Sequence, residues 1–305
     1  MISVLSKIKY YIDIFTIRYK WYLFSFKKNA LGISNTDYGK EMIVSLTSYP
    51  ARIQYVSKTI QSIMIQRVKP NRIILWLGYD KFINKEKDLP KKLLDLRKYG
   101  LEIKWCKDLR SYTKLIPALK EFPNAIIITV DDDIYYRESM IEQLIHSYKI
   151  NPSFIWAHRV TKIELKDGDY RAVPGGEDTW KKPSFLHKLT GVGGVLYPPD
   201  VFFNGVLDEE IFENICATND DIWFWLMAVL NKIKIAQVSR SKSTKLLYVS
   251  DSQKGPALSK INDANEKLFW KDFNNMLRAY PEVDTVLRKE YATIMAEVLN
   301  GSKND

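Results

Sequence analysis

Short apolar runs alternate with helical patterns in the first half of the chain. Four runs are rich in β-branched and other apolar side chains, at residues 42–46, 73–77, 101–105 and 125–130. Uninterrupted runs of this length are typical of strands that are buried on both faces of a parallel sheet. The stretch 52–66 repeats its apolar positions every three or four residues, as one face of a helix does. This alternation predicts an α/β fold with a mostly parallel sheet flanked by helices.

The second half of the chain predicts further helices, two strands and one long loop. Apolar spacing predicts helices at 138–149, 222–230, 262–278 and 283–299, and strands at 154–157 and 233–238. The polar, glycine-containing stretch 161–184 predicts a loop that faces a substrate. The glycines within 191–194 allow the backbone to come close to a ligand.

Three consecutive aspartates, Asp131, Asp132 and Asp133, directly follow the apolar run 125–130. Adjacent carboxylates are costly to bury without compensating cations. We therefore expect them at the carboxyl end of a strand, where ligands bind in open α/β sheets. Asp131 and Asp133 lie on the same side of an extended backbone, and their hard oxygens suit Mg²⁺ or Mn²⁺ beside a diphosphate. The alternative is an acidic loop that caps the next helix.

A second acidic pair, Asp220 and Asp221, opens the apolar stretch 222–230. Acids in a first helical turn complement the helix dipole, and this alone would explain the pair. However, the aromatic residues at 223–225 indicate a helix that is buried nearly all round. Burial raises the pKa of a carboxylate toward the range that a general base needs. Either aspartate is therefore a candidate catalytic base.

Polar side chains also follow two other predicted strands. Thr47, Tyr49 and Arg52 follow the first strand, where they suit a ribose and a stacked base. Arg110 and Lys114 follow the third strand and are candidates to neutralise a diphosphate. A solvated charged turn is an equally good interpretation of the second group. The chain has no GxGxxG or GKS loop in this region, which argues against a dinucleotide-binding domain or a P-loop.

Composition adds a distinct N-terminal segment, residues 1–30. The whole chain has a net charge of +10, and this segment contains six basic residues and one acidic residue. Its aromatic and basic residues interleave, which favours either a helix at an anionic membrane surface or a helix packed on the body. No uncharged run approaches the ~20 residues of a membrane span. The remaining charge is nearly balanced, so nucleic acid is a disfavoured partner.

The two cysteines, Cys106 and Cys216, exclude a disulfide framework and a thiolate zinc site. The patterns together predict three parts. They are a basic aromatic segment (1–30), an α/β domain (40–240) and a C-terminal helical extension (241–305).

Five motifs taken together resemble bacterial glycosyltransferases of the GT-A fold, most closely family-2-like enzymes of capsule and lipopolysaccharide loci. The motifs are SLTSYPARI, KDLRSYTKLIPAL, IIITVDDD, GVGGVLYPP and TNDDIWFWLMAVLN. The resemblance covers about residues 42–240 and implies a nucleotide-diphospho-sugar transferase fold. It implies that Asp131-Asp132-Asp133 is a DxD motif that contacts the nucleotide-sugar, with Asp133 the direct metal ligand and Asp131 beside it.

The resemblance also assigns roles to residues outside the DxD motif. Thr47, Tyr49, Asp108 and Lys114 would lie near the nucleotide. Two glycines, Gly193 and Gly194, would line the sugar and acceptor site. The pair Asp220-Asp221 stands where the family carries a Glu-Asp pair whose acid deprotonates the acceptor hydroxyl. Because this chain has Asn-Asp-Asp at that point, the identity of the base stays open.

The function that follows is transfer of a sugar from a nucleotide-diphosphate donor, preferably a UDP-sugar, to a hydroxyl of a glycan or lipid-linked acceptor. It is expected to depend on Mn²⁺ or Mg²⁺ and to invert the anomeric centre. The absence of a QxxRW motif favours single addition over processive synthesis. The expected location is the cytoplasm or the inner face of the cytoplasmic membrane, bound peripherally. The alternatives are a nucleotidyltransferase acting on a sugar phosphate and a non-catalytic module that binds anionic surfaces.

Overall fold

The computed structural model describes the chain except for residues 1–3, 174–181, 239–245, 251, 253–265 and 302–305. The α-helices are α1 (Val4–Ser25), α2 (Val56–Met64), α3 (Lys91–Leu94), α4 (Ile116–Glu121), α5 (Met140–Ile150), α6 (Glu209–Ile215), α7 (Asp220–Leu230), α9 (Glu266–Ala279) and α10 (Pro281–Gly301). The strands are β1 (Met42–Thr47), β2 (Arg72–Gly78), β3 (Leu101–Cys106), β4 (Ile126–Thr129), β5 (Ile155–Ala157), β6 (Val160–Lys166), β7 (Asp169–Val173), β8 (His187–Leu189), β9 (Val195–Tyr197) and β10 (Ile235–Gln237). Short 3-10 helices are η1 (Lys85–Asp88), η2 (Asp95–Tyr99), η3 (Arg110–Lys114), η4 (Gly191–Gly193) and η5 (Asn204–Leu207).

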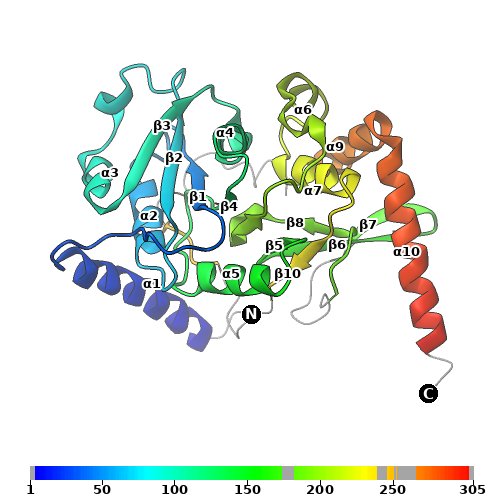
Figure 1. The fold of residues 1–305 in the computed structure, drawn as a ribbon, viewed down its shortest axis with the longest axis horizontal. Helices are drawn as coiled ribbons and strands as arrows, with labels where there is room; N and C mark the ends of the chain where they lie inside the picture. The colour runs from blue at the N-terminus through cyan, green and yellow to red at the C-terminus, as the bar shows by residue number, and fades with distance from the viewer. Residues whose placement is uncertain (1–3, 174–181, 239–245, 251, 253–265, 302–305) are drawn as a thin grey trace.

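A seven-stranded sheet forms the centre of the molecule, in the order β10-β5-β9-β4-β1-β2-β3 (Figure 1). The strands β4, β1, β2 and β3 pair in parallel, and so do β10 and β5. Strand β9 runs antiparallel to both of its neighbours, β4 and β5. The sheet confirms the predicted α/β fold with mostly parallel strands. The antiparallel β9 lies in the glycine-containing stretch that the sequence left without a strand.

Apolar residues on both faces of β1 explain why the sheet needs helices on both sides. Ile43 belongs to one core cluster, which also contains Trp223 of α7. Val44 belongs to the other cluster, which also contains Ile60 of α2. All four residues are completely buried. Complete burial of one such side chain contributes about 1.5–3 kcal/mol, so the two helices and β1 stabilise one another.

A second, three-stranded sheet corrects one prediction. The stretch 161–184 was expected to be a loop, but β6 and β7 form an antiparallel hairpin, and β8 pairs with the other edge of β6. Asp167 and Gly168 make the turn with φ values of 54° and 89°. An Asp-Gly pair with both residues at positive φ is a favoured two-residue hairpin turn. The remaining part of the predicted loop, 174–181, lies outside the described residues.

The terminal helices lie at opposite ends of the molecule (Figure 1). Helix α1 contacts α2, while α9 and α10 both contact α7. The N-terminal segment thus contains the helix α1, and the described C-terminal residues contain the helices α9 and α10. Among the described residues, none of the helices combines the length and apolarity of a membrane span.

Candidate active site

The carboxyl ends of the central strands β1 and β4 carry the first part of the site. Strand β4 ends at Thr129, and the three aspartates follow after one residue, Val130. Helix η3 returns from the edge strand β3 and contacts both β1 and β2. The hydroxyl of Ser45 in β1 donates to the backbone oxygen of Lys114 at 2.6 Å, and the Trp76 indole donates to the same hydroxyl at 3.0 Å. These bonds fix Lys114 over the strand ends.

Arg52 neutralises two of the three aspartates. Its Nη1 atom lies 2.8 Å from Oδ1 of Asp132 and 3.0 Å from Oδ2 of Asp133. Ser48 donates to Oδ2 of Asp132 at 2.6 Å, so both carboxylate oxygens of Asp132 are engaged. Burial raises the pKa of Asp132, and the Arg52 guanidinium and Ser48 hydroxyl oppose this shift. Arg52 therefore compensates the charge of these two aspartates, and its predicted contact with a nucleotide stays a prediction.

Lys114 joins the two acidic motifs. Its Nζ atom lies 3.1 Å from Oδ1 of Asp131 and 3.1 Å from Oδ2 of Asp220. Only 9% of its side chain is exposed. Burial lowers the pKa of Lys114, but Asp131, Asp220 and Asp221 outweigh burial and raise it well above its usual value. Lys114 is therefore a charged cation that holds acids 89 residues apart in one site.

Asp220 and Asp221 differ in their surroundings although both begin α7. Asp220 is 7% exposed and faces Lys114, whereas Asp221 is partly exposed. Both oxygens of Asp221 accept from the backbone N–H of Gly191, at 3.2 and 3.1 Å. Burial and the neighbouring Asp220 raise the pKa of Asp221 to about 6, while Lys114 opposes them. Asp221 thus combines solvent access with the pKa expected of a general base.

Gly191 is a site residue that had no predicted role of its own beyond that of the glycine stretch 191–194. A Cβ atom there would lie 2.9 Å from Nζ of Lys114 and 3.1 Å from Oδ1 of Asp221. Any other residue would therefore push the cation and the acid apart. The predicted glycines Gly193 and Gly194 face other groups: a Cβ at Gly193 would meet Arg159, and one at Gly194 would meet Met140. The predicted sugar- and acceptor-site roles of Gly193 and Gly194 stay predictions.

Tyr136 is a site residue that sequence reasoning missed. Its hydroxyl accepts from the backbone N–H of Asp131 at 2.9 Å and donates to the backbone oxygen of Val192 at 3.1 Å. It therefore ties the aspartate segment to the η4 segment that carries Gly191. Tyr136 is 3% exposed, and burial raises its pKa well above the usual value. Its position five residues after Asp131 gave no sequence signal, because an aromatic residue there is equally suited to a core.

The other predicted nucleotide contacts surround these groups. The Thr47 hydroxyl donates to the backbone oxygen of Trp76 at 3.0 Å, and the Arg52 guanidinium lies 5.6 Å from the centre of the Tyr49 ring. A carboxylate oxygen of Asp108 accepts from the backbone N–H of Arg110 at 2.9 Å. Arg110 is exposed and has a φ of 57°. These contacts leave the predicted nucleotide roles of Thr47, Tyr49, Asp108 and Arg110 as predictions.

The aspartates do not form a ready-made metal centre. Among the described residues, no three His, Cys, Asp or Glu side chains are placed to hold one ion. Mg²⁺ at phosphate sites needs only one or two carboxylates, since waters and phosphates complete its shell. Asp131, with 28% of its side chain exposed, fits that role. A cation of the protein engages one oxygen of each residue, Lys114 at Asp131 and Arg52 at Asp133, but only 10% of the Asp133 side chain is exposed, so Asp133 fits less well. The metal ion stays a prediction, with Asp131 the better-placed ligand.

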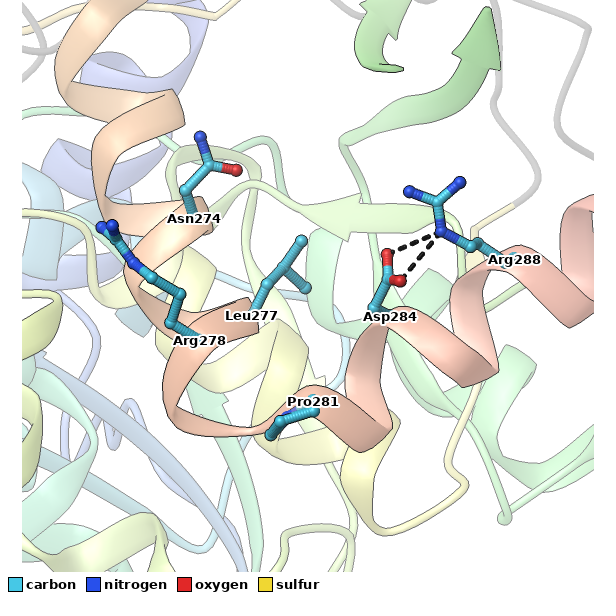
Figure 2. A pocket seen from close by; sticks show the side chains of 6 residues that line it. All are labelled: Asn274, Leu277, Arg278, Pro281, Asp284 and Arg288. Atoms are coloured by element: carbon cyan, nitrogen blue, oxygen red, sulfur yellow. Dashed lines mark hydrogen bonds and ion pairs between the residues drawn. The ribbon is translucent and has the colours of Figure 1, made fainter. Parts of the chain in front are cut away.

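One open pocket of about 510 Å³ lies between α9 and α10 (Figure 2). Its lining residues are Asn274, Leu277, Arg278, Pro281, Asp284 and Arg288. Arg288 Nε lies 3.0 and 2.8 Å from the two oxygens of Asp284, and Arg278 donates to the Asn275 side chain at 2.6 Å. Both cations are therefore engaged within the protein. None of the predicted site residues lines this pocket.

Comparison with known proteins gives similarity to solved structures only. No protein-family model matches the chain, and no curated protein matches it significantly. The S. aureus TarS fragment 1–349 is 14% identical to this chain. The match covers 78% of this chain and 72% of the TarS fragment, with a TM-score of 0.43. The same fragment in complex with UDP-GlcNAc is 14% identical over 81% of this chain and 70% of its own, with a TM-score of 0.44.

A third solved structure is CMP:2-keto-3-deoxy-manno-octonic acid synthetase complexed with CTP. It is 12% identical to this chain, covers 65% of this chain and 88% of its own, and has a TM-score of 0.38. Likeness of this degree concerns the arrangement of helices and strands.

Proposed function

We propose that the protein is a glycosyltransferase that moves a sugar from a nucleotide-diphosphate donor to an acceptor hydroxyl. The observation that carries the proposal is the position of Lys114 between Asp131 and Asp220. It brings the acids at the end of β4 and the acids at the start of α7 into one site. A donor-binding corner and a general base are the two parts that sugar transfer needs.

Asp221 is the proposed base. Its partly exposed carboxylate takes the proton of the acceptor hydroxyl, and the hydroxyl oxygen forms the new bond to the anomeric carbon. The bond between that carbon and the diphosphate oxygen breaks, and the electron pair leaves with the diphosphate. The Gly191 N–H orients the Asp221 carboxylate. A direct displacement of this kind inverts the anomeric centre.

Cations of the chain meet the charge of the departing diphosphate. Lys114 is buried and fixed, and Arg110 is exposed on the same 3-10 helix, η3. Fixed cations in a partly desolvated site stabilise developing negative charge more strongly than mobile ones in water. A Mg²⁺ or Mn²⁺ ion on Asp131 would add further neutralisation of the diphosphate. The acceptor class we propose is a glycan or lipid-linked glycan of a bacterial surface polysaccharide.

The products distinguish this proposal from its alternatives. The protein is incubated with a panel of nucleotide-sugars and glycan or lipid-linked acceptors, with Mn²⁺, with Mg²⁺ or with EDTA. Glycosyl transfer releases a nucleoside diphosphate and lengthens the acceptor. A nucleotidyltransferase would instead consume a nucleoside triphosphate and a sugar phosphate and release pyrophosphate. Pyrophosphate as the product, or no nucleotide-sugar binding under any condition, would overturn the proposal.

A further inference from the structure

Helix α1 has two apolar stripes on opposite faces. The inner stripe contains Tyr10, Ile14, Ile17, Trp21 and Phe24, which follow one another at intervals of three or four residues. Ile17 is 7% exposed and clusters with Tyr135, Leu247 and Val249. The Trp21 ring packs edge-on against Tyr99, with a centroid distance of 5.1 Å. This stripe attaches the helix to the body of the protein.

The outer stripe repeats at the same intervals but faces solvent. It contains Ile8, Ile12, Phe15, Tyr19, Tyr22 and the adjoining Phe26. Their exposed fractions are 50%, 55%, 68%, 52%, 57% and 71%. With 3.6 residues per turn, these positions fall on one side of the helix, roughly opposite the inner stripe. Single exposed apolar residues are ordinary on a protein surface, but a continuous row marks an interaction site.

Basic residues lie along both borders of the outer stripe. On a helical projection, Lys7 and Arg18 fall on one border and Lys9 and Lys20 on the other. Lys7, Lys9 and Arg18 are exposed, and within the described part of the chain none of them takes part in an ion pair. An apolar and aromatic face bordered on both sides by Lys and Arg suits the interface of an anionic bilayer.

Ion pairs hold the helix so that the outer stripe cannot turn inward. Asp13 lies 2.9 Å from Arg137, and Lys20 lies 2.6 Å from Glu138. Asp13 is the one acidic residue of α1, and it is already paired. A second copy of this chain would therefore bring two basic helix borders together without acids on the partner helix to neutralise them. Anionic lipid supplies the missing negative charge.

We propose that α1 is a membrane-docking helix whose outer stripe inserts into the headgroup region of an anionic membrane. The helix lies parallel to the membrane surface, with aromatic and aliphatic side chains in the interface and Lys and Arg against lipid headgroups. This inference rests on α1 alone and does not depend on the proposed function.

The test is co-sedimentation of the full chain with two kinds of vesicle, one of phosphatidylcholine alone and one of phosphatidylcholine with about 30% phosphatidylglycerol, which makes the surface anionic. We expect binding to the anionic vesicles that weakens at high salt. The double variant Ile12→Ser/Phe15→Ser should bind at least about tenfold more weakly, because two buried apolar side chains are lost. Lys9→Gln and Arg18→Gln should each weaken binding about fivefold.

The matched control is Ile83→Ser, which removes another exposed isoleucine, 84% exposed, from a different part of the surface. It should bind vesicles like the unchanged protein. Circular dichroism and thermal unfolding show whether each variant is folded. Absence of anionic-vesicle binding by the folded protein, or unchanged binding of the outer-stripe variant, would overturn the proposal. So would a dimer in solution that Ile12→Ser/Phe15→Ser converts to a monomer, since a second copy would then cover the stripe.

Discussion

Helices α1 and α7 both carry apolar residues on opposite faces, yet the fold uses them in opposite ways. In α7, every residue from Ile222 to Val229 is at most 1% exposed. In α1, Ile17 is the one residue below a tenth exposed among its described positions. The difference follows the charges. Helix α7 has two acids at its first turn and no charge further along, whereas basic residues recur along the whole of α1.

Apolar content alone therefore does not decide whether a helix is buried. A helix can be surrounded by protein only if its charged residues sit at one end, where they reach a site or solvent. Asp220 and Asp221 meet this condition and become part of the candidate site. The basic residues of α1 cannot all reach solvent from the inside of a fold, so one face of that helix stays at the surface.

The largest expected effect on stability is in the core of α7. Trp223→Ala should destabilise the protein by about 3–5 kcal/mol, because the side chain is fully buried and its removal leaves a cavity. Urea denaturation followed by circular dichroism measures the change. A loss below about 1 kcal/mol would show that α7 is less tightly enclosed than its burial indicates.

Lys114→Met tests the junction between α7 and the aspartates. It should cost about 3 kcal/mol, because Asp131 and Asp220 lose the cation that compensates them. The double variant Lys114→Met/Asp220→Asn should recover part of this loss, since one unpaired carboxylate is gone. Equal losses in the single and double variants, measured by urea denaturation, would contradict a shared ion pair.

The pH dependence of stability tests Asp221. Its pKa is about 6 in the folded protein and near 4 in an unfolded chain, so the unfolded state releases the proton first. Stability contributed by this group should therefore fall, on the order of 1 kcal/mol, as the pH rises from about 4 to 6. Asp221→Asn should lack this component and be more stable than the unchanged protein at pH 7. Identical pH profiles of unfolding would refute the raised pKa.

Substitutions in the outer stripe of α1 should change the free energy of unfolding least. Tyr19→Ala, in the outer stripe, should change stability by no more than about 0.5 kcal/mol, because the side chain is 52% exposed. The matched inner-stripe variant Ile17→Ala should cost about 2 kcal/mol or more. Thermal unfolding of the pair gives the contrast directly. Similar losses in both would mean that the outer stripe is packed against protein.

Much of the fold could be predicted from residue patterns, because buried strands and amphipathic helices have local signatures. The strand β9 was missed because its apolar run, 195–197, lies between glycines and two prolines, which are typical of a turn or loop. The β6–β7 hairpin was missed although its Asp167-Gly168 turn is a recognisable signal. Gly100, in contrast, was predictable as a helix stop and has a φ of 100°.

The candidate site was predictable in its parts but not in its connections. Both acidic motifs follow or begin apolar segments, which is a local signal. The ion pairs of Lys114 join residues 17 and 106 positions away, and no local pattern encodes them. The same limit applies to the ion pairs of Arg52, whose partners Asp132 and Asp133 lie 80 and 81 positions away. Gly191 was not singled out because its charged neighbours come from distant segments.

The most direct test of the account compares sugar transfer and donor binding in Asp221→Asn. With the donor and acceptor identified by the product assay, kcat should fall about 10²–10⁴-fold, because a general base contributes that much to such reactions. Donor affinity, measured by calorimetry, should stay within about threefold of the unchanged protein, since the substituted group acts on the acceptor. Transfer at the full rate in Asp221→Asn, with the protein folded and the donor bound, would contradict the account.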